Sequence, residues 1–146
     1  MVQAHPLTGV GLGNFENFLP RYADSQLESR GIAHNTFLEY MAELGPLGLL
    51  SYLGVLGFSL RSLKQARRWA KKNHEEFMSN VSVAVQIGII GFATAACFIS
   101  AEYQKPFWFF ISITVVISRL IAQTRAKMKN DPTPMRSAAA AFLAIL

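Results

Sequence analysis

The chain has 146 residues, 51% of them apolar, and a formal net charge of +5. Its single cysteine, Cys97, excludes an internal disulfide and a thiolate metal site. The three histidines, His5, His34 and His74, lack the spacing of a metal site, so the sequence predicts neither a bound metal nor another cofactor.

The first predicted element is a loop over residues 1–33, which is rich in the turn formers glycine and proline. At most one short helix is expected in it, around Phe15 to Tyr22. The glycines of this loop suggest a nucleotide-binding segment, but Asn14 stands where the dinucleotide pattern requires a further glycine. The segment also lacks the Gly-Lys-Ser/Thr ending of a phosphate loop. We therefore expect a loop that approaches other backbone closely.

Three apolar runs without charge follow, at residues 45–60, 81–101 and 107–118. A helix needs about 20 apolar residues to cross the roughly 30 Å of hydrocarbon in a bilayer. The second run has that length. The first reaches it if Arg61 snorkels to the interface, and the third if Arg119 does so. A soluble protein this short has too little surface to cover three such helices.

The pattern predicts an all-α membrane protein in which three transmembrane helices follow an external glycine-rich loop. The expected helices lie near residues 35–63, 80–101 and 107–126, within a membrane domain of residues 34–130. The tail, residues 131–146, ends in an apolar stretch that is too short to span a bilayer.

The basic residues fall on alternate sides of the predicted spans. They are concentrated in residues 61–72 and 125–136, whereas the turn between the second and third spans is neutral. By the positive-inside rule, residues 1–33 lie outside and residues 64–78 lie in the cytoplasm. The basic run could instead bind nucleic acid. Since topology accounts for it, we expect membrane lipid and not nucleic acid as a partner.

The first predicted helix begins with an amphipathic segment, Thr36 to Glu43, before it enters the apolar run. Its apolar residues are expected on one side and the two acidic residues, Glu39 and Glu43, on the other. Pro46 removes a backbone hydrogen bond and favours a kink. Small residues in the first two spans predict close approach by other helices; they include Gly48, Gly54, Gly57, Gly88 and Gly91.

The pair His34-Asn35 is the candidate catalytic site, because it places an imidazole at the mouth of the first span. Histidine can remove a proton from a hydroxyl near neutral pH. Asn35 and Glu43 are candidates for binding a polar substrate, since their spacing puts them on one helix face. The pair could instead be only a helix cap. Arg21 and Arg30 are the arginines of the external loop, and a guanidinium suits a pyrophosphate.

Residues His5 to Leu50 resemble the O-antigen ligase/O-antigen polymerase family of bacterial membrane glycosyltransferases. The head of the chain, HPLTGVGLGNF, is similar to the glycine-rich HPLxGxGxGNF element of their large external loop. His34-Asn35, followed after nine residues by Gly45 and then Gly48, matches the family's His-Asn-x9-Gly-x-x-Gly signature. Both elements precede a predicted spanning helix, as they do in the family.

This resemblance implies transfer of a glycan from a polyprenyl-pyrophosphate carrier to an acceptor hydroxyl on the outer side of the cytoplasmic (inner) membrane. The acceptor would be a lipopolysaccharide core sugar, a growing polysaccharide or a protein. The family's essential histidine maps onto His34, where it would activate the acceptor hydroxyl. Arginines stabilise the departing pyrophosphate, and Arg21 and Arg30 are candidates by location.

Family members have many more spanning helices than three, so the resemblance implies the C-terminal portion of such an enzyme. We expect it to need further transmembrane helices, of the same or a split protein, and to be inactive alone. The alternative is a small non-enzymatic membrane protein, either a remnant or an interaction module. A transporter is disfavoured because the apolar runs, apart from Arg119 near the end of the third, contain none of the charged residues that transport requires.

Overall fold

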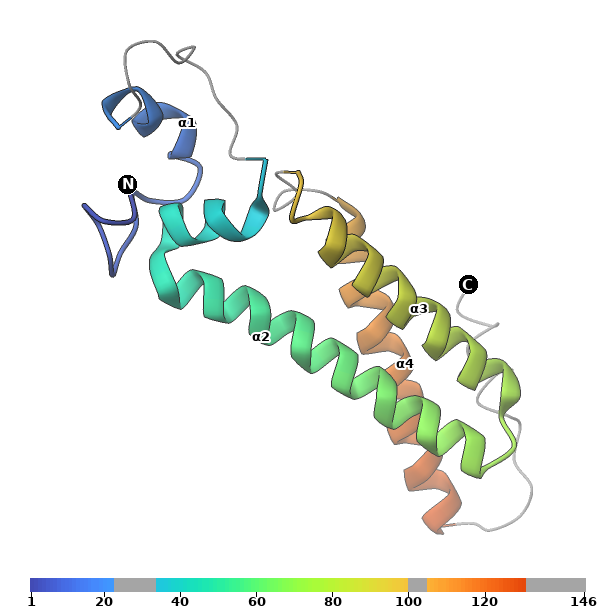
Figure 1. Cartoon of the computed structure of the whole chain (residues 1–146). Coiled ribbons are helices and arrows are strands. Elements are labelled where there is room, and N and C mark those ends of the chain that lie inside the picture. The colour runs from blue at the N-terminus through green and yellow to red at the C-terminus, as the bar shows by residue number, and fades with distance from the viewer. Residues whose placement is uncertain (23–33, 100–104, 131–146) are drawn as a thin grey trace. The chain divides into compact units, whose positions relative to one another are not determined.

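The computed structural model describes residues 1–22, 34–99 and 105–130, and these residues form helices and turns without strands. The short helix α1 covers Phe15–Phe18 and continues as the 3-10 helix η1, Leu19–Arg21. The long helices are α2, Thr36–Lys72, α3, Glu76–Ala95, and α4, Lys105–Asn130 (Figure 1). All three are long and apolar enough to span a membrane, which confirms the predicted fold class.

The helix ends differ from the predicted ones at both ends of the basic connection. Helix α2 runs past Leu63 to Lys72, because lysine and arginine favour helix and suit the negative end of its dipole. Helix α3 begins at Glu76, an acidic residue that suits the positive end of a helix. It ends at Ala95, where the backbone enters a turn that reaches Ile99.

The chain divides into two compact units. The first comprises Met1–Leu56 and Gly91–Gln104, and the second comprises Gly57–Ile90 and Lys105–Leu146. The second unit holds most of the large, fully buried side chains, among them Leu63, Met78 and Ile117. The first unit holds the glycine-rich head, α1 and the start of α2, and it therefore contains both sequence motifs.

Helix α2 is broken within the first unit. Gly45 has φ 66° and ψ −166°, which is not helical, and Pro46 follows it. A residue before proline is driven out of the helical region, and a positive φ is open to glycine at little cost. The predicted kink is therefore present, and it lies at the glycine rather than at the proline.

The two acidic residues of the segment before the break in α2 are buried. Glu39 and Glu43 are the buried residues, with exposed fractions of 6% and 3%, whereas Leu38 is 60% exposed. The sequence places these acidic residues on the side away from the apolar ones, and it does not indicate which side another segment covers. The glycine-rich head accounts for the burial of Glu43, because the amides of Gly13 and Phe15 donate hydrogen bonds to its carboxylate.

The small residues of the spans do not all mediate close contacts. A side chain at Gly88 would collide with the ring of Phe110, so this glycine permits a close approach of α3 and α4 in the second unit. At Gly54, Gly57 and Gly91, an added Cβ would meet nothing within 4 Å among the described atoms. The prediction of close packing is thus confirmed at Gly88 and finds no contact at those three glycines.

Candidate active site at the start of helix α2

Asn35 is the N-cap of α2. Its side-chain oxygen accepts hydrogen bonds from the backbone amides of Phe37 at 3.0 Å and Leu38 at 3.1 Å. These amides are among the donors that the first turn of a helix leaves without an intrahelical partner. The cap interpretation of the His34-Asn35 pair therefore holds for Asn35, and it fixes where the helix begins.

The same residues bind the helix start to the turn that follows α3. The Asn35 amide nitrogen donates to the carbonyl of Cys97 at 3.1 Å. Thr36, which is fully buried, donates from its backbone nitrogen to Ala96 at 2.9 Å and from its hydroxyl to Ile99 at 2.7 Å. Three hydrogen bonds thus join segments about sixty residues apart, so the position of His34 is tied to this turn.

His34 precedes the cap and has a backbone φ of 47°, in the left-handed region. That conformation costs a residue with a Cβ roughly 1–2 kcal/mol, and the hydrogen bonds of the next two residues hold it in place. The imidazole is exposed and makes no hydrogen bond to any residue that the structure describes. His34 is therefore a strained and exposed histidine immediately before the start of α2.

The glycine-rich head docks on the break in α2. Because Pro46 has no N–H, the carbonyl of Ala42 has no donor four residues later; it accepts from Val10 at 2.9 Å instead. The carbonyl of Glu43 accepts from Gly11 at 2.8 Å. A side chain at Gly9 would collide with both carbonyl groups, so this position requires glycine. The predicted close approach to backbone is confirmed.

The Glu43 carboxylate holds the remainder of the head. One oxygen accepts from the amide of Gly13 at 2.8 Å and the other from the amide of Phe15, the first residue of α1, at 3.0 Å. Hydrogen bonds from neutral amides to a buried carboxylate are stronger than those to a neutral acceptor. Glu43 therefore links α2 to α1 across the glycine-rich head. Its predicted role, and that of Asn35, in binding substrate stays a prediction.

Of the two arginines predicted to bind an anion, the structure describes one. Arg21 is exposed at the end of η1, and its guanidinium carbon lies 4.8 Å from the centroid of the Phe18 ring. This cation–π contact orients the side chain without neutralising its charge. His5 shares a 3.2 Å hydrogen bond with the Tyr22 hydroxyl. Arg30, the second predicted anion-binding residue, lies outside the described residues.

Glu39 has a different environment from Glu43. It is 6% exposed, and its Oε2 atom is buried without a hydrogen-bond partner among the described residues. A buried carboxylate oxygen without a donor is energetically costly. The sequence places Glu39 four residues from both Asn35 and Glu43, on the same face. Glu39 was not among the predicted site residues, although that spacing is a sequence signal that could have added it.

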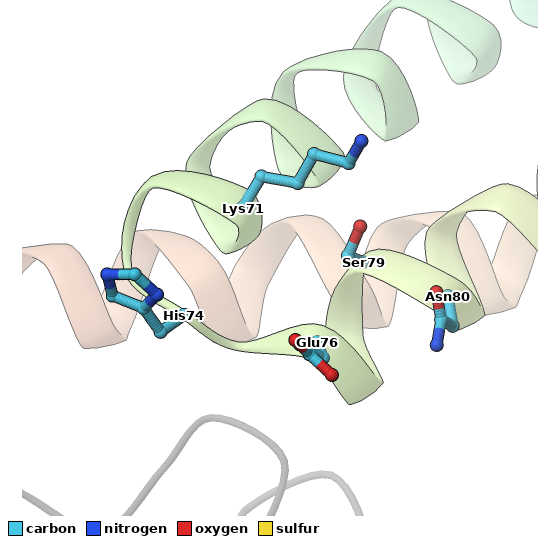
Figure 2. Close-up of a pocket in the computed structure, with 5 residues that line it drawn as sticks. All are labelled: Lys71, His74, Glu76, Ser79 and Asn80. Atoms are coloured by element: carbon cyan, nitrogen blue, oxygen red, sulfur yellow. The ribbon is translucent and has the colours of Figure 1, made fainter.

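His74 provides a contrast to His34, because it too has a positive φ, of 57°, and an exposed side chain. It lies on the connection between α2 and α3, beside a cavity of about 360 Å³ that Lys71, Glu76, Ser79 and Asn80 also line (Figure 2). No group of three potential metal ligands occurs among the described residues. The left-handed conformation alone therefore does not distinguish a site; the surrounding motif does.

Comparison with known protein families identifies the motif-bearing segment. Residues 1–53 match the O-antigen ligase family. The matched segment includes the docked head, His34 and the break at Gly45, and it ends within α2. The resemblance that the two motifs predicted is therefore confirmed over this range. No curated protein and no solved structure matches the chain.

Within the matched segment, the structure brings together three of the predicted site residues. His34, Asn35 and Glu43 all lie in the first unit, around the start of α2. The bonds from Thr36 to Ala96 and Ile99 had no signal in the sequence, because nothing local pairs a helix start with a distant turn. The docking of the head on Ala42 and Glu43 could have been inferred from Pro46, which frees a carbonyl.

Proposed function

We propose that this chain provides the catalytic segment of an O-antigen ligase-like glycosyltransferase of a bacterial inner membrane. The reaction transfers a glycan from a polyprenyl-pyrophosphate carrier to a hydroxyl of an acceptor sugar or protein. The family match over residues 1–53 supports the class of enzyme. The exposed, left-handed His34 at the start of an apolar helix is the observation that carries the assignment of the site.

The His34 imidazole acts as the general base. It accepts the proton of the acceptor hydroxyl as that oxygen attacks the anomeric carbon of the glycan. The new glycosidic C–O bond forms while the bond from the anomeric carbon to the pyrophosphate oxygen breaks, and the polyprenyl pyrophosphate leaves with the electron pair. Water then takes the proton from the imidazolium. Such proton transfer contributes about 10²–10⁴-fold to a rate.

The remaining site residues stabilise the charge of the leaving group or position other parts of the site. Arg21 and Arg30 stabilise the negative charge that grows on the leaving pyrophosphate, since a guanidinium bonds two of its oxygens at once. Asn35 positions His34 through the cap of α2. Glu43 positions the head through the Gly13 and Phe15 amides, and both Asn35 and Glu43 offer polar atoms to the acceptor.

The reaction is on the outer side of the membrane in this proposal, which labelling tests. In a Cys97→Ser background, Leu12→Cys and Lys72→Cys place single thiols at exposed positions of the head and of the basic connection. An impermeant maleimide should label position 12 in intact cells and position 72 only after permeabilisation. Labelling of position 72 from outside would overturn the topology.

The transfer itself is tested in the organism that carries the gene. Deletion should cause the polyprenyl-pyrophosphate glycan to accumulate and its transferred product to disappear, as measured by mass spectrometry of lipid extracts and by gel analysis of surface glycans. The wild-type gene should restore both. Unchanged donor and product levels in the deletion would instead favour a non-enzymatic membrane protein.

A further inference from the structure

A second site lies in the second unit, between α2 and α4. A cavity of about 200 Å³ is lined by four polar residues, Ser62, Gln65, Ser118 and Arg125, together with three apolar ones. None of the lining residues is acidic. The cavity therefore offers hydrogen-bond donors and one positive charge, which is the lining that an anionic group requires.

The cavity lies where both helices change from apolar to basic. On α2 the uncharged run ends at Leu60, immediately before Arg61 and Ser62. On α4 it ends at Ser118, immediately before Arg119. In a membrane-spanning helix this change marks the boundary between hydrocarbon and headgroups. A ligand in the cavity would therefore lie at the depth of lipid headgroups.

Arg125 is held in place by an aromatic ring. Its guanidinium carbon lies 5.8 Å from the centroid of the Trp69 ring. Tryptophan is enriched at membrane interfaces, and a cation over its face loses some freedom while it keeps its charge. Arg125 is thus an ordered cation at the rim of the cavity.

Ser118 differs from the other described hydroxyl residues of α4. Ser112, Thr114 and Thr124 each donate to the carbonyl four residues earlier, at 2.8–2.9 Å. The Ser118 hydroxyl is buried and has no hydrogen-bond partner among the described residues. A buried hydroxyl without a partner costs free energy, which a ligand oxygen would recover. This hydroxyl and Arg125 are independent indications of the same ligand.

We propose that this cavity binds the headgroup of an anionic phospholipid, with a phosphate oxygen on Arg125 and a phosphate or ester oxygen on Ser118. The adjoining uncharged runs favour a lipid over free phosphate, because acyl chains can follow them into the hydrocarbon. A zwitterionic headgroup is a poorer ligand, because its own cation is repelled by Arg125. The cavity at Lys71 (Figure 2) lacks this chemistry, since Glu76 contributes a carboxylate to its lining. The proposal does not rest on the glycosyltransferase assignment.

Trp69 serves as the reporter. The full chain carrying Trp108→Phe, which leaves one tryptophan, is placed in phosphatidylcholine vesicles with increasing fractions of brominated phosphatidylglycerol. Bromine quenches tryptophan fluorescence on contact, so the half-saturating fraction measures occupancy of the site. Arg125→Gln should raise that fraction about tenfold, and Ser118→Ala about threefold, because one charge-assisted and one neutral hydrogen bond are lost.

Two matched variants distinguish binding of an anionic lipid in this cavity from non-specific electrostatic attraction of such lipids to the basic region. Lys71→Gln removes a charge from the same basic region and should shift the fraction much less than Arg125→Gln. Ser112→Ala removes a hydroxyl that already donates to its own helix, so the half-saturating fraction should stay unchanged. Equal shifts for Arg125→Gln and Lys71→Gln would overturn the proposal. So would equal quenching by brominated phosphatidylcholine, or loss of quenching in millimolar inorganic phosphate, which would indicate a free-phosphate site.

Discussion

The two units of this chain satisfy their polar groups in different ways. In the first, the backbone groups freed at Gly45-Pro46 are taken by a segment some thirty residues earlier in the chain, and the cap of α2 reaches a turn some sixty residues later. In the second, the hydroxyls of Ser82, Ser112, Thr114 and Thr124 donate to carbonyls of their own helix. Hydrogen bonds between distant segments require particular residues at both ends, whereas a hydroxyl that bonds within its own helix requires only the helix. Both sequence motifs lie in the first unit, where the hydrogen bonds between distant segments occur.

The sharpest test of this contrast uses the two left-handed, exposed histidines, one in each unit. His34→Ala should lower glycan transfer about 10²–10⁴-fold, because it removes the proposed general base. His74→Ala should leave transfer unchanged. The measurement is the rate of donor consumption in membranes from complemented deletion strains, normalised to the amount of protein in the membrane. If His34→Ala lowers the rate of glycan transfer less than threefold, His34 is only part of the helix cap and not the general base.

The next largest effect is expected at the break in α2. Gly45→Ala forces a φ of 66° on alanine and directs a methyl group at the carbonyl of Leu7, so the head should undock. The backbone conformation alone costs about 1–3 kcal/mol. Hydrogen exchange at the Val10 amide should accelerate. Gly54→Ala, whose added methyl group would meet nothing among the described atoms, is the control and should leave exchange unchanged.

A smaller effect is expected at the carboxylate that holds the head. Glu43→Gln replaces one acceptor oxygen by an amide nitrogen, so either the Gly13 or the Phe15 amide loses its acceptor. The loss should be about 1.5–3 kcal/mol of docking free energy, the value of a hydrogen bond to a charged group. Exchange at these two amides measures it. Glu76→Gln, at an exposed glutamate of the second unit, should not change them.

The smallest effect is expected at the cap. Asn35→Ala should cost about 1 kcal/mol of helix stability and expose the Phe37 and Leu38 amides to exchange. Asn35→Asp keeps the acceptor for these amides but removes the donor to Cys97. In Asn35→Asp, the Phe37 and Leu38 amides should stay protected. If glycan transfer is nevertheless slower, the hydrogen bond from Asn35 to the Cys97 carbonyl, and not the cap, positions His34. Equal transfer by wild type and Asn35→Asp would assign no catalytic role to that bond.

The sequence by itself determined the three long helices, since uncharged runs of this length are stable as helices in lipid whatever their surroundings. It also determined the motif segment and the location of the break, because Gly45-Pro46 cannot continue a regular helix. Both are local properties of the chain.

Only the tertiary structure decided which face of the Thr36–Glu43 segment is buried. Periodicity placed Glu39 and Glu43 on the side away from the apolar residues, but it could not show that another segment covers them. The head covers this face by donating two amides to the Glu43 carboxylate and two more to the carbonyls of Ala42 and Glu43. Hydrogen bonds between segments distant in sequence leave no periodic signal, so residue types alone could not reveal them.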